Sequence, residues 1–95
     1  MVEIIWSPRA IHDVESILEY IAADSRHAAC WTLAQLLTRV ENLRDFPKLG
    51  RIIPEIGRET AREVIYKSYR IMYEVNENRI EILAVHHGAR DFGYQ

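Results

Sequence analysis

Residues 69–87 read YRIMYEVNENRIEILAVHH, and this stretch decides the fold. Apolar side chains alternate with polar ones through 69–75 and again through 79–87, which is the period of a β-strand with one buried face. Asn76-Glu77-Asn78 separates the two segments and is typical of a turn, because asparagine tolerates left-handed backbone geometry. The pattern therefore predicts two antiparallel strands. In the second strand it assigns one face to Ile80, Ile82, Ala84 and His86, and the other to Glu81, Leu83, Val85 and His87.

A third strand is predicted immediately before this pair, over residues 62–66. Lys67-Ser68 is the only spacer between 66 and 69, so we expect a two-residue turn and a three-stranded antiparallel meander. Residues 46–57 precede it and carry prolines and glycines among apolar side chains. This composition is too apolar for a solvated linker, and it predicts an ordered loop packed on the core.

Two helices are predicted before the loop, at about 8–23 and 26–45. Ser7-Pro8 is a helix start, because the serine hydroxyl can accept from a free N–H and proline is tolerated in the first turn. Apolar residues then recur every three or four positions in both segments. The connection of two or three residues requires an antiparallel hairpin.

A short alternating strand at 2–6 completes the order β-αα-βββ. The predicted fold class is α+β, with an N-terminal strand and the antiparallel helical hairpin packed on one face of a mainly antiparallel sheet, in a single domain of residues 1–95. The predicted core consists of Val14, Ile17, Leu18, Ile21, Leu33, Leu36, Val40, Ile71, Tyr73, Ile80 and Ile82.

Composition excludes several classes of protein. The formal net charge of −2 disfavours a strongly basic nucleic-acid binder. The single cysteine cannot form an internal disulfide, and no apolar run approaches the roughly 18 residues of a spanning helix. We therefore expect a cytoplasmic protein with no membrane partner. Motifs for nucleotide, hydrolase or metal sites are missing from the sequence, so we expect no cofactor and no metal.

One set of polar residues could carry chemistry, on the strand face opposite the core: Arg70, His87, Arg90 and Asp91, with Tyr66 or Tyr94 near them in sequence. RNA cleavage by its own 2′-hydroxyl needs a proton acceptor, cations and a proton donor, which histidine, arginine and tyrosine can supply. The structural alternative is that Arg70 pairs with a glutamate and that His87-Gly88 ends the last strand.

Trp31 lies on the polar side of the second predicted helix, among Gln35, Thr38 and Asn42. An isolated tryptophan in such a place often marks a contact with a partner. The alternative is that Trp31 covers the 46–57 loop or the C-terminal residues.

Seven short stretches lie in order between residues 6 and 91: WSPRA (6–10), ILEYIA (17–22), FPKLGR (46–51), PE (54–55), REVIY (62–66), YRIMYEV (69–75) and HGARD (87–91). Taken together and in this order, they resemble the RelE/ParE superfamily of toxins from type II toxin–antitoxin pairs, and the resemblance extends over nearly the whole chain.

The resemblance implies a toxin that is neutralised by a cognate antitoxin and can form a toxin–antitoxin hetero-oligomer. RelE-like members cut messenger RNA on the ribosome, whereas ParE-like members inhibit DNA gyrase. The 47–51 loop, the 69–73 motif and the 87–91 stretch resemble the ParE branch more, which favours gyrase and a ParD-like antitoxin, with the ribosome as the alternative target. The candidate binding residues are Trp31, Arg51, Arg62, Tyr66, Arg70 and Arg90, and the candidates for a nuclease site are Arg70, His87, Arg90 and Tyr94.

Overall fold

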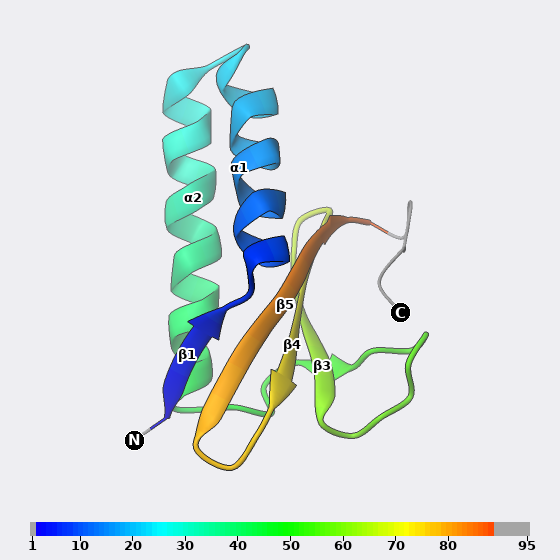
Figure 1. Ribbon diagram of the computed structural model, residues 1–95. Helices are drawn as coiled ribbons and strands as arrows, with labels where there is room; N and C mark the ends of the chain where they lie inside the picture. Colours follow the sequence, from blue (N-terminus) through cyan, green and yellow to red (C-terminus); the bar gives the residue numbers. More distant parts are fainter. Residues whose placement is uncertain (1, 89–95) are drawn as a thin grey trace.

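The computed structural model describes residues 2–88, and its elements follow the predicted order (Figure 1). They are β1 (Glu3–Trp6), α1 (Pro8–Ala22), α2 (Arg26–Glu41), the 3₁₀ turn η1 (Asn42–Arg44), β2 (Arg51–Ile52), β3 (Ala61–Tyr66), β4 (Tyr69–Val75) and β5 (Arg79–His87).

The strands form one sheet in the order β1-β5-β4-β3-β2. β1 runs parallel to β5, and the other neighbours are antiparallel. The helices form an antiparallel hairpin on one face of the sheet, and the tip of this hairpin extends past the sheet (Figure 1). The predicted α+β fold class is therefore confirmed. One strand was not predicted: β2 lies within the segment expected to be a loop and pairs with β3.

Serine hydroxyls begin both helices, as the sequence predicts for the first. Ser7 Oγ accepts from Ala10 N (3.0 Å), and Ser25 Oγ accepts from Ala28 N (3.0 Å). Ser7 Oγ also donates to the carbonyl oxygen of Leu83 in β5 (2.9 Å). One side chain thus joins the start of α1 to the sheet.

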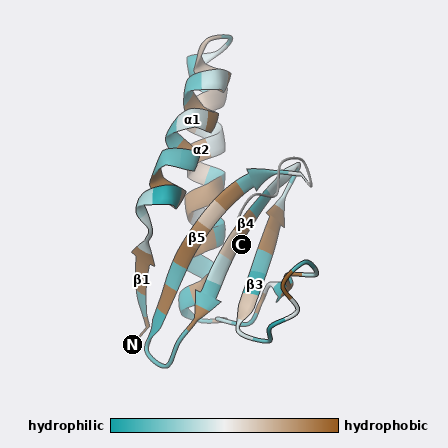
Figure 2. Ribbon diagram, turned by 45° about the vertical axis from the view of Figure 1, so that its right-hand side comes forward, coloured by the Kyte–Doolittle hydropathy of each residue, from teal (hydrophilic) through white to brown (hydrophobic). Residues whose placement is uncertain are grey.

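The main core lies between the helices and the sheet, where Figure 2 shows hydrophobic positions along β5. Of the predicted core, Val14, Leu36, Val40, Ile71, Tyr73, Ile80 and Ile82 are buried, while Ile17, Leu18, Leu33 and Ile21 are partly buried. On the other face of the sheet, a small cluster of Ile53, Ala61 and Met72 is covered by the segment after β2.

A β-bulge in β5 corrects the predicted alternation of its side chains. Tyr73 pairs with Ile82 and Met72 pairs with Ala84, so Leu83 has no partner residue in β4. An extra residue of this kind reverses the alternation beyond it. Val85 therefore joins the main core with Ile82, which the alternation had assigned to the opposite face.

Candidate functional site

Arg70 occupies the face of the sheet away from the helices, where two carboxylates enclose its guanidinium. Nε donates to Glu63 Oε1 (2.7 Å), while Nη1 and Nη2 donate to Glu55 Oε2 (3.0 Å) and Oε1 (2.7 Å). Such two-point contacts between arginine and carboxylate are among the stronger ion pairs. The Arg70 side chain is only 7% exposed. The structure thus places Arg70 in a buried ion pair with Glu63 and a partly exposed one with Glu55, which agrees with the structural alternative for this residue.

Glu63 joins a second arginine to this arrangement. Its side chain is fully buried, and its Oε2 accepts from Nε of Arg51 (2.6 Å), a residue that is itself largely exposed. We refer to Arg51, Glu55, Glu63 and Arg70 as the arginine–glutamate cluster. Its formal charges cancel, because two guanidinium groups face two carboxylates.

Hydrogen bonds from Arg70 shift the pKa of one carboxylate in this cluster. They lower the pKa of Glu55 from 4.5 to about 2, with smaller contributions from a backbone hydrogen bond and from the charges of Arg70 and Arg51. The hydrogen bonds to Glu55 and Glu63 in turn raise the pKa of Arg70. The Glu55 carboxylate and the Arg70 guanidinium are therefore both ionised at neutral pH.

A shallow cavity of about 430 Å³ opens beside the cluster. Arg51, Glu55 and Arg70 line it together with Ile65 and Lys67. Lys67 belongs to the two-residue turn predicted between β3 and β4 and adopts a positive φ of 53°. The cavity presents both signs of charge and one exposed apolar side chain, a surface suited to contact with a protein.

His87 lies on the opposite face of the sheet from Arg70, which corrects the predicted cluster of these two residues. Its ring meets the ring of Tyr69 edge-on, with centroids 5.2 Å apart. The two rings border a cavity of about 390 Å³ that is also lined by Ser16 and Tyr20 of α1. The bulge at Leu83 explains the correction, because a period-two pattern through 79–87 contains no sign of it.

His86 takes the position beside Arg70 instead. The two residues are register partners in β4 and β5, and His86 is buried. Arg9 Nη2 donates to His86 Nε2 (2.9 Å), which requires that nitrogen to carry no proton. The alternating pattern predicts His86 on the core face, with Ile80, Ile82 and Ala84, and not beside Arg70.

Two of the predicted binding residues have structural contacts. Arg62 Nη1 donates to Gly50 O (2.8 Å), and Arg62 also binds the backbone oxygen and carboxylate of Glu59. Tyr66 is buried in the main core, and the guanidinium of Arg39 lies 4.5 Å from its ring centroid. The buried Tyr66 ring presents little surface to a partner in the free toxin.

Trp31 is 57% exposed on α2, as the partner-contact interpretation requires. α2 runs from the tip of the hairpin toward β1, so Trp31 lies in the half near the tip, away from the 46–57 segment (Figure 1). Arg90, Asp91 and Tyr94, the remaining candidates, lie outside the described residues.

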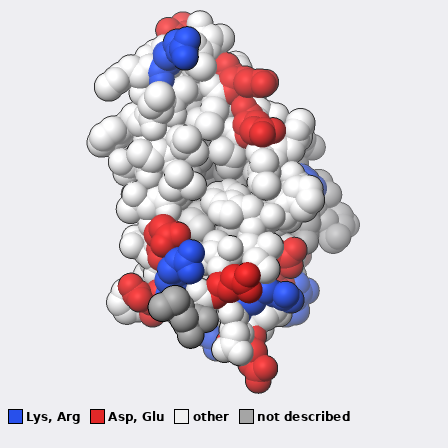
Figure 3. Space-filling view, turned by 60° about the vertical axis from the view of Figure 1, so that its left-hand side comes forward, with Lys and Arg blue, Asp and Glu red and all other residues white. Residues whose placement is uncertain are grey.

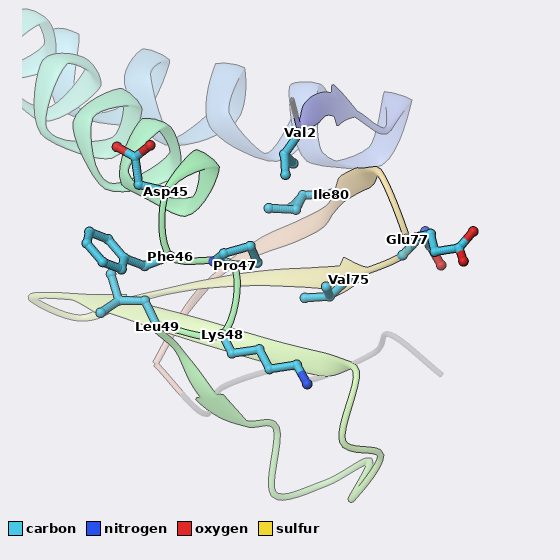
Figure 4. A pocket seen from close by; sticks show the side chains of 10 residues that line it. Val2, Asp45, Phe46, Pro47, Lys48, Leu49, Val75, Glu77 and Ile80 are labelled. Atoms are coloured by element: carbon cyan, nitrogen blue, oxygen red, sulfur yellow. The ribbon is translucent and has the colours of Figure 1, made fainter.

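An apolar groove of about 590 Å³, which the sequence analysis did not predict, lies between η1 and the β4–β5 turn. Figure 4 shows Val2, Val75 and Ile80 around Pro47. Phe46 and Leu49, exposed by 64% and 56%, line the same groove because a turn joins them, with Leu49 N donating to Phe46 O (3.0 Å). In the sequence, the available signal for this groove was a pair of large apolar residues on either side of Pro47. The groove can accept an apolar side chain of a protein.

Glu55 and Glu63 are the functional-site residues that sequence reasoning missed. Glu63 could have been found, because it lies on the predicted strand at 62–66, adjacent to the strand of Arg70. Glu55 stands in the PE (54–55) stretch of the family resemblance, but no periodicity predicts the path of the segment after β2, which brings it to Arg70.

Neither a metal site nor a membrane span is found in the described part of the chain. Within residues 2–88 no group of three or more histidine, cysteine, aspartate or glutamate residues is placed to hold a metal ion. Over the same residues, neither helix has the length and apolarity needed to cross a bilayer.

Comparison with known proteins identifies the class. Residues 4–92 match the model of the family described as ParE toxin of type II toxin-antitoxin system, parDE. The chain belongs to this toxin family, and the resemblance to the RelE/ParE superfamily is confirmed.

Two relatives show how the chain sits among known toxins. It is 31% identical over 90 residues to "Toxin RelE2" of Caulobacter vibrioides, covering 95% of this chain and 99% of that protein. Its fold matches a chain of the structure titled "Chromosomal ParDE TA system from P. aeruginosa" with a TM-score of 0.76 and 18% identity, covering 93% of this chain and 97% of that one.

Proposed function

We propose that this toxin acts in the cytoplasm by binding and inhibiting DNA gyrase, without catalysing a reaction, and that a cognate ParD-like antitoxin neutralises it. The observation that carries this proposal is the engagement of Arg70 by Glu55 and Glu63. This candidate catalytic cation is held by two carboxylates, of which Glu63 is fully buried.

A nuclease needs cations that are available to a crowded phosphoryl group in the transition state. All three nitrogens of the Arg70 guanidinium already donate to carboxylate oxygens at 2.7–3.0 Å. A phosphate that approached this guanidinium would meet the Glu55 and Glu63 carboxylates as like charges. Binding to a protein target does not require an available cation, since both signs of charge and exposed apolar side chains can contact a protein surface.

A ribosome-dependent ribonuclease is the second candidate, and one observation favours it. His86 is the register partner of Arg70, so a histidine and an arginine do lie next to each other on neighbouring strands. His86 is buried and bonded to Arg9, which supports a structural role for it in the free toxin.

Parallel assays on the same purified toxin test the two functions. We expect the wild-type chain to block supercoiling by reconstituted gyrase, and added antitoxin to relieve the block. His86→Ala and His87→Ala should retain this inhibition to the extent that they retain the fold, measured by circular dichroism.

The ribonuclease would give the opposite result. Removing its proton-transfer group would lower cleavage of messenger RNA on ribosomes by roughly 10²- to 10⁴-fold. Ribosome-dependent cleavage that is lost in either histidine variant, with gyrase unaffected at saturating toxin, would refute the gyrase proposal.

A further inference from the structure

The outer surface of α2 carries no charged residue along most of its length. Residues 27–38 contain no Asp, Glu, Lys or Arg, whereas the exposed positions of α1 include Arg9, Glu15 and Glu19. Figure 3, which brings this side of the molecule forward, shows a broad uncharged area between charged groups near the hairpin tip and near its base. A surface helix is normally polar on its outer side, so α2 departs from the usual pattern.

Large apolar side chains are exposed on this uncharged surface. Trp31 is 57% exposed and Leu37 is 43% exposed. Ala34 lies between them in sequence, one helical turn from each, and it is exposed as well. The buried residues of α2 lie on the other side of the helix and include Leu36 and Val40. The surface is therefore separate from the main core.

The two ends of α2 carry charges of opposite sign. Arg26 is its first residue and Glu41 is its last. A helix N-terminus attracts negative charge and a C-terminus attracts positive charge, so Arg26 and Glu41 oppose the helix dipole, whereas Arg39 in the last turn favours it. An antiparallel helix of the same sequence would bring a glutamate to the N-terminus and an arginine to the C-terminus.

We propose that α2 is a docking surface for a second copy of this chain, which packs its own α2 antiparallel across a two-fold axis at Ala34. This pairing sets Trp31 of each copy against Leu37 of the other, and His27 against Glu41. Ala34 meets its own copy on the axis, where its small side chain allows the helices to approach to the usual 8–10 Å.

Self-association fits this surface because the surface is complementary to itself. A two-fold interface uses the same patch on both subunits, and the charge-free middle of α2 presents no like charges to its copy. Glu41 is 61% exposed at its side chain although it pairs with Arg44, so it remains open to His27 of a second copy. Because a single helix from each copy makes a small interface, we expect a weak dimer with a dissociation constant on the order of micromolar.

This inference is independent of the proposed target. The outer surface of α2 faces away from the sheet, whereas the arginine–glutamate cluster lies on the far side of the sheet (Figure 1). A second copy on α2 therefore leaves the cluster uncovered.

Sedimentation equilibrium of the full chain, refolded after removal of its antitoxin, tests the proposal. We expect a dimer whose fraction rises with concentration, and a monomer for Ala34→Glu, which places two like charges on the axis. Tyr20→Glu is the matched control: Tyr20 is 84% exposed on α1, and the variant should dimerise like the wild type. A wild-type chain that stays monomeric up to about 100 µM would refute the proposal. Equal dimerisation of folded Ala34→Glu would refute it as well.

Crosslinking tests the geometry. In a Cys30→Ser background, Ala34→Cys should form a disulfide-linked dimer on oxidation, because the axis brings the two residue-34 backbones within disulfide range. Glu15→Cys on α1 should remain uncrosslinked.

A charge reversal tests the antiparallel orientation. His27→Glu should weaken the dimer severalfold, and adding Glu41→Lys should restore it, since these residues meet only in the antiparallel arrangement. Failure of the second change to restore the dimer would contradict this arrangement.

The antitoxin is the rival occupant of this surface, with Trp31 as its anchor. A Trp31→Ala variant that loses antitoxin affinity while the wild-type toxin never dimerises would assign the surface to the antitoxin and overturn the proposal. Loss of dimer with unchanged antitoxin affinity is the expected result.

Discussion

Arg70 and Glu63 lie on neighbouring strands and form an ion pair of 2.7 Å in which neither side chain is more than 7% exposed. Breaking such a pair by removing one partner leaves a buried charge without full compensation. The pair therefore has a structural role that any functional test of Arg70 must take into account.

We expect Arg70→Ala to lower the free energy of unfolding by about 3 to 5 kcal/mol, because Glu63 stays buried with only Arg51 to balance it. Arg51→Ala is the matched control; its side chain is 61% exposed, so its loss should cost about 1 kcal/mol or less. Urea denaturation of both variants measures the difference. Equal losses would show that Glu63 does not depend on Arg70.

Acid should weaken the fold in a range set by Glu55. Its pKa is about 2 in the folded chain and near 4.5 when unperturbed, so the unfolded state binds more protons between these values. Its contribution to stability is complete above pH 4.5 and is lost as the pH falls toward 2. Urea midpoints measured across this range should show a shallower dependence in Glu55→Gln. An unchanged dependence would mean that the Arg70 contact does not persist in solution.

Truncation of the core should be costly on both sides of the helix–sheet interface. Leu36 and Ile82 are 1% and 0% exposed, and replacing either with alanine should cost roughly 2 to 5 kcal/mol. Ile65→Ala, at a position 46% exposed, should cost less than about 1 kcal/mol. Losses below about 1 kcal/mol at both core positions would reject the packing described above.

Gly50 should tolerate no side chain. Its N–H donates to the hydroxyl of Tyr73 (2.9 Å), and a Cβ at this position would overlap the backbone oxygen of Glu63. We expect Gly50→Ala to cost about 1 to 3 kcal/mol by overpacking. It should also speed hydrogen exchange at residue 50. Tyr73→Phe removes only the hydrogen bond and provides the comparison, with faster exchange at the same amide and no overlap. Protection of residue 50 that survives both changes would contradict the contact.

Periodicity predicted most of the fold because burial on one face leaves a regular trace in the sequence. Helices at 8–23 and 26–45 and strands at 62–66, 69–75 and 79–87 all correspond to elements of the structure. The register beyond Leu83 could not be predicted, because a bulge adds one residue without changing composition. That single residue exchanged the positions expected for His86 and His87.

The candidate site was harder to predict because its contacts join segments that are distant in sequence. Arg70 binds Glu55 from a segment between strands, and Arg9 of α1 reaches His86 of β5. Residue types and spacing indicated that Arg70 was important, but they could not show whether it would meet a carboxylate or remain available to a ligand. Pairings of this kind depend on the path of the chain between regular elements.

The parallel pairing of β1 with β5 has a consequence for synthesis. β1 is made first, yet its only neighbour in the sheet is the last strand of the described chain, so it must wait while α1, α2, β3 and β4 emerge. Contacts between such distant segments form late and slowly, because the intervening loop must close first. The hydroxyl of Ser7 accepts a hydrogen bond from α1 and donates one to Leu83 O, so its second hydrogen bond also forms only after β5 has been made. A growing chain that has produced only its helical hairpin is therefore not yet a folded toxin. The toxin fold is complete only after β5 has been translated and has paired with β1.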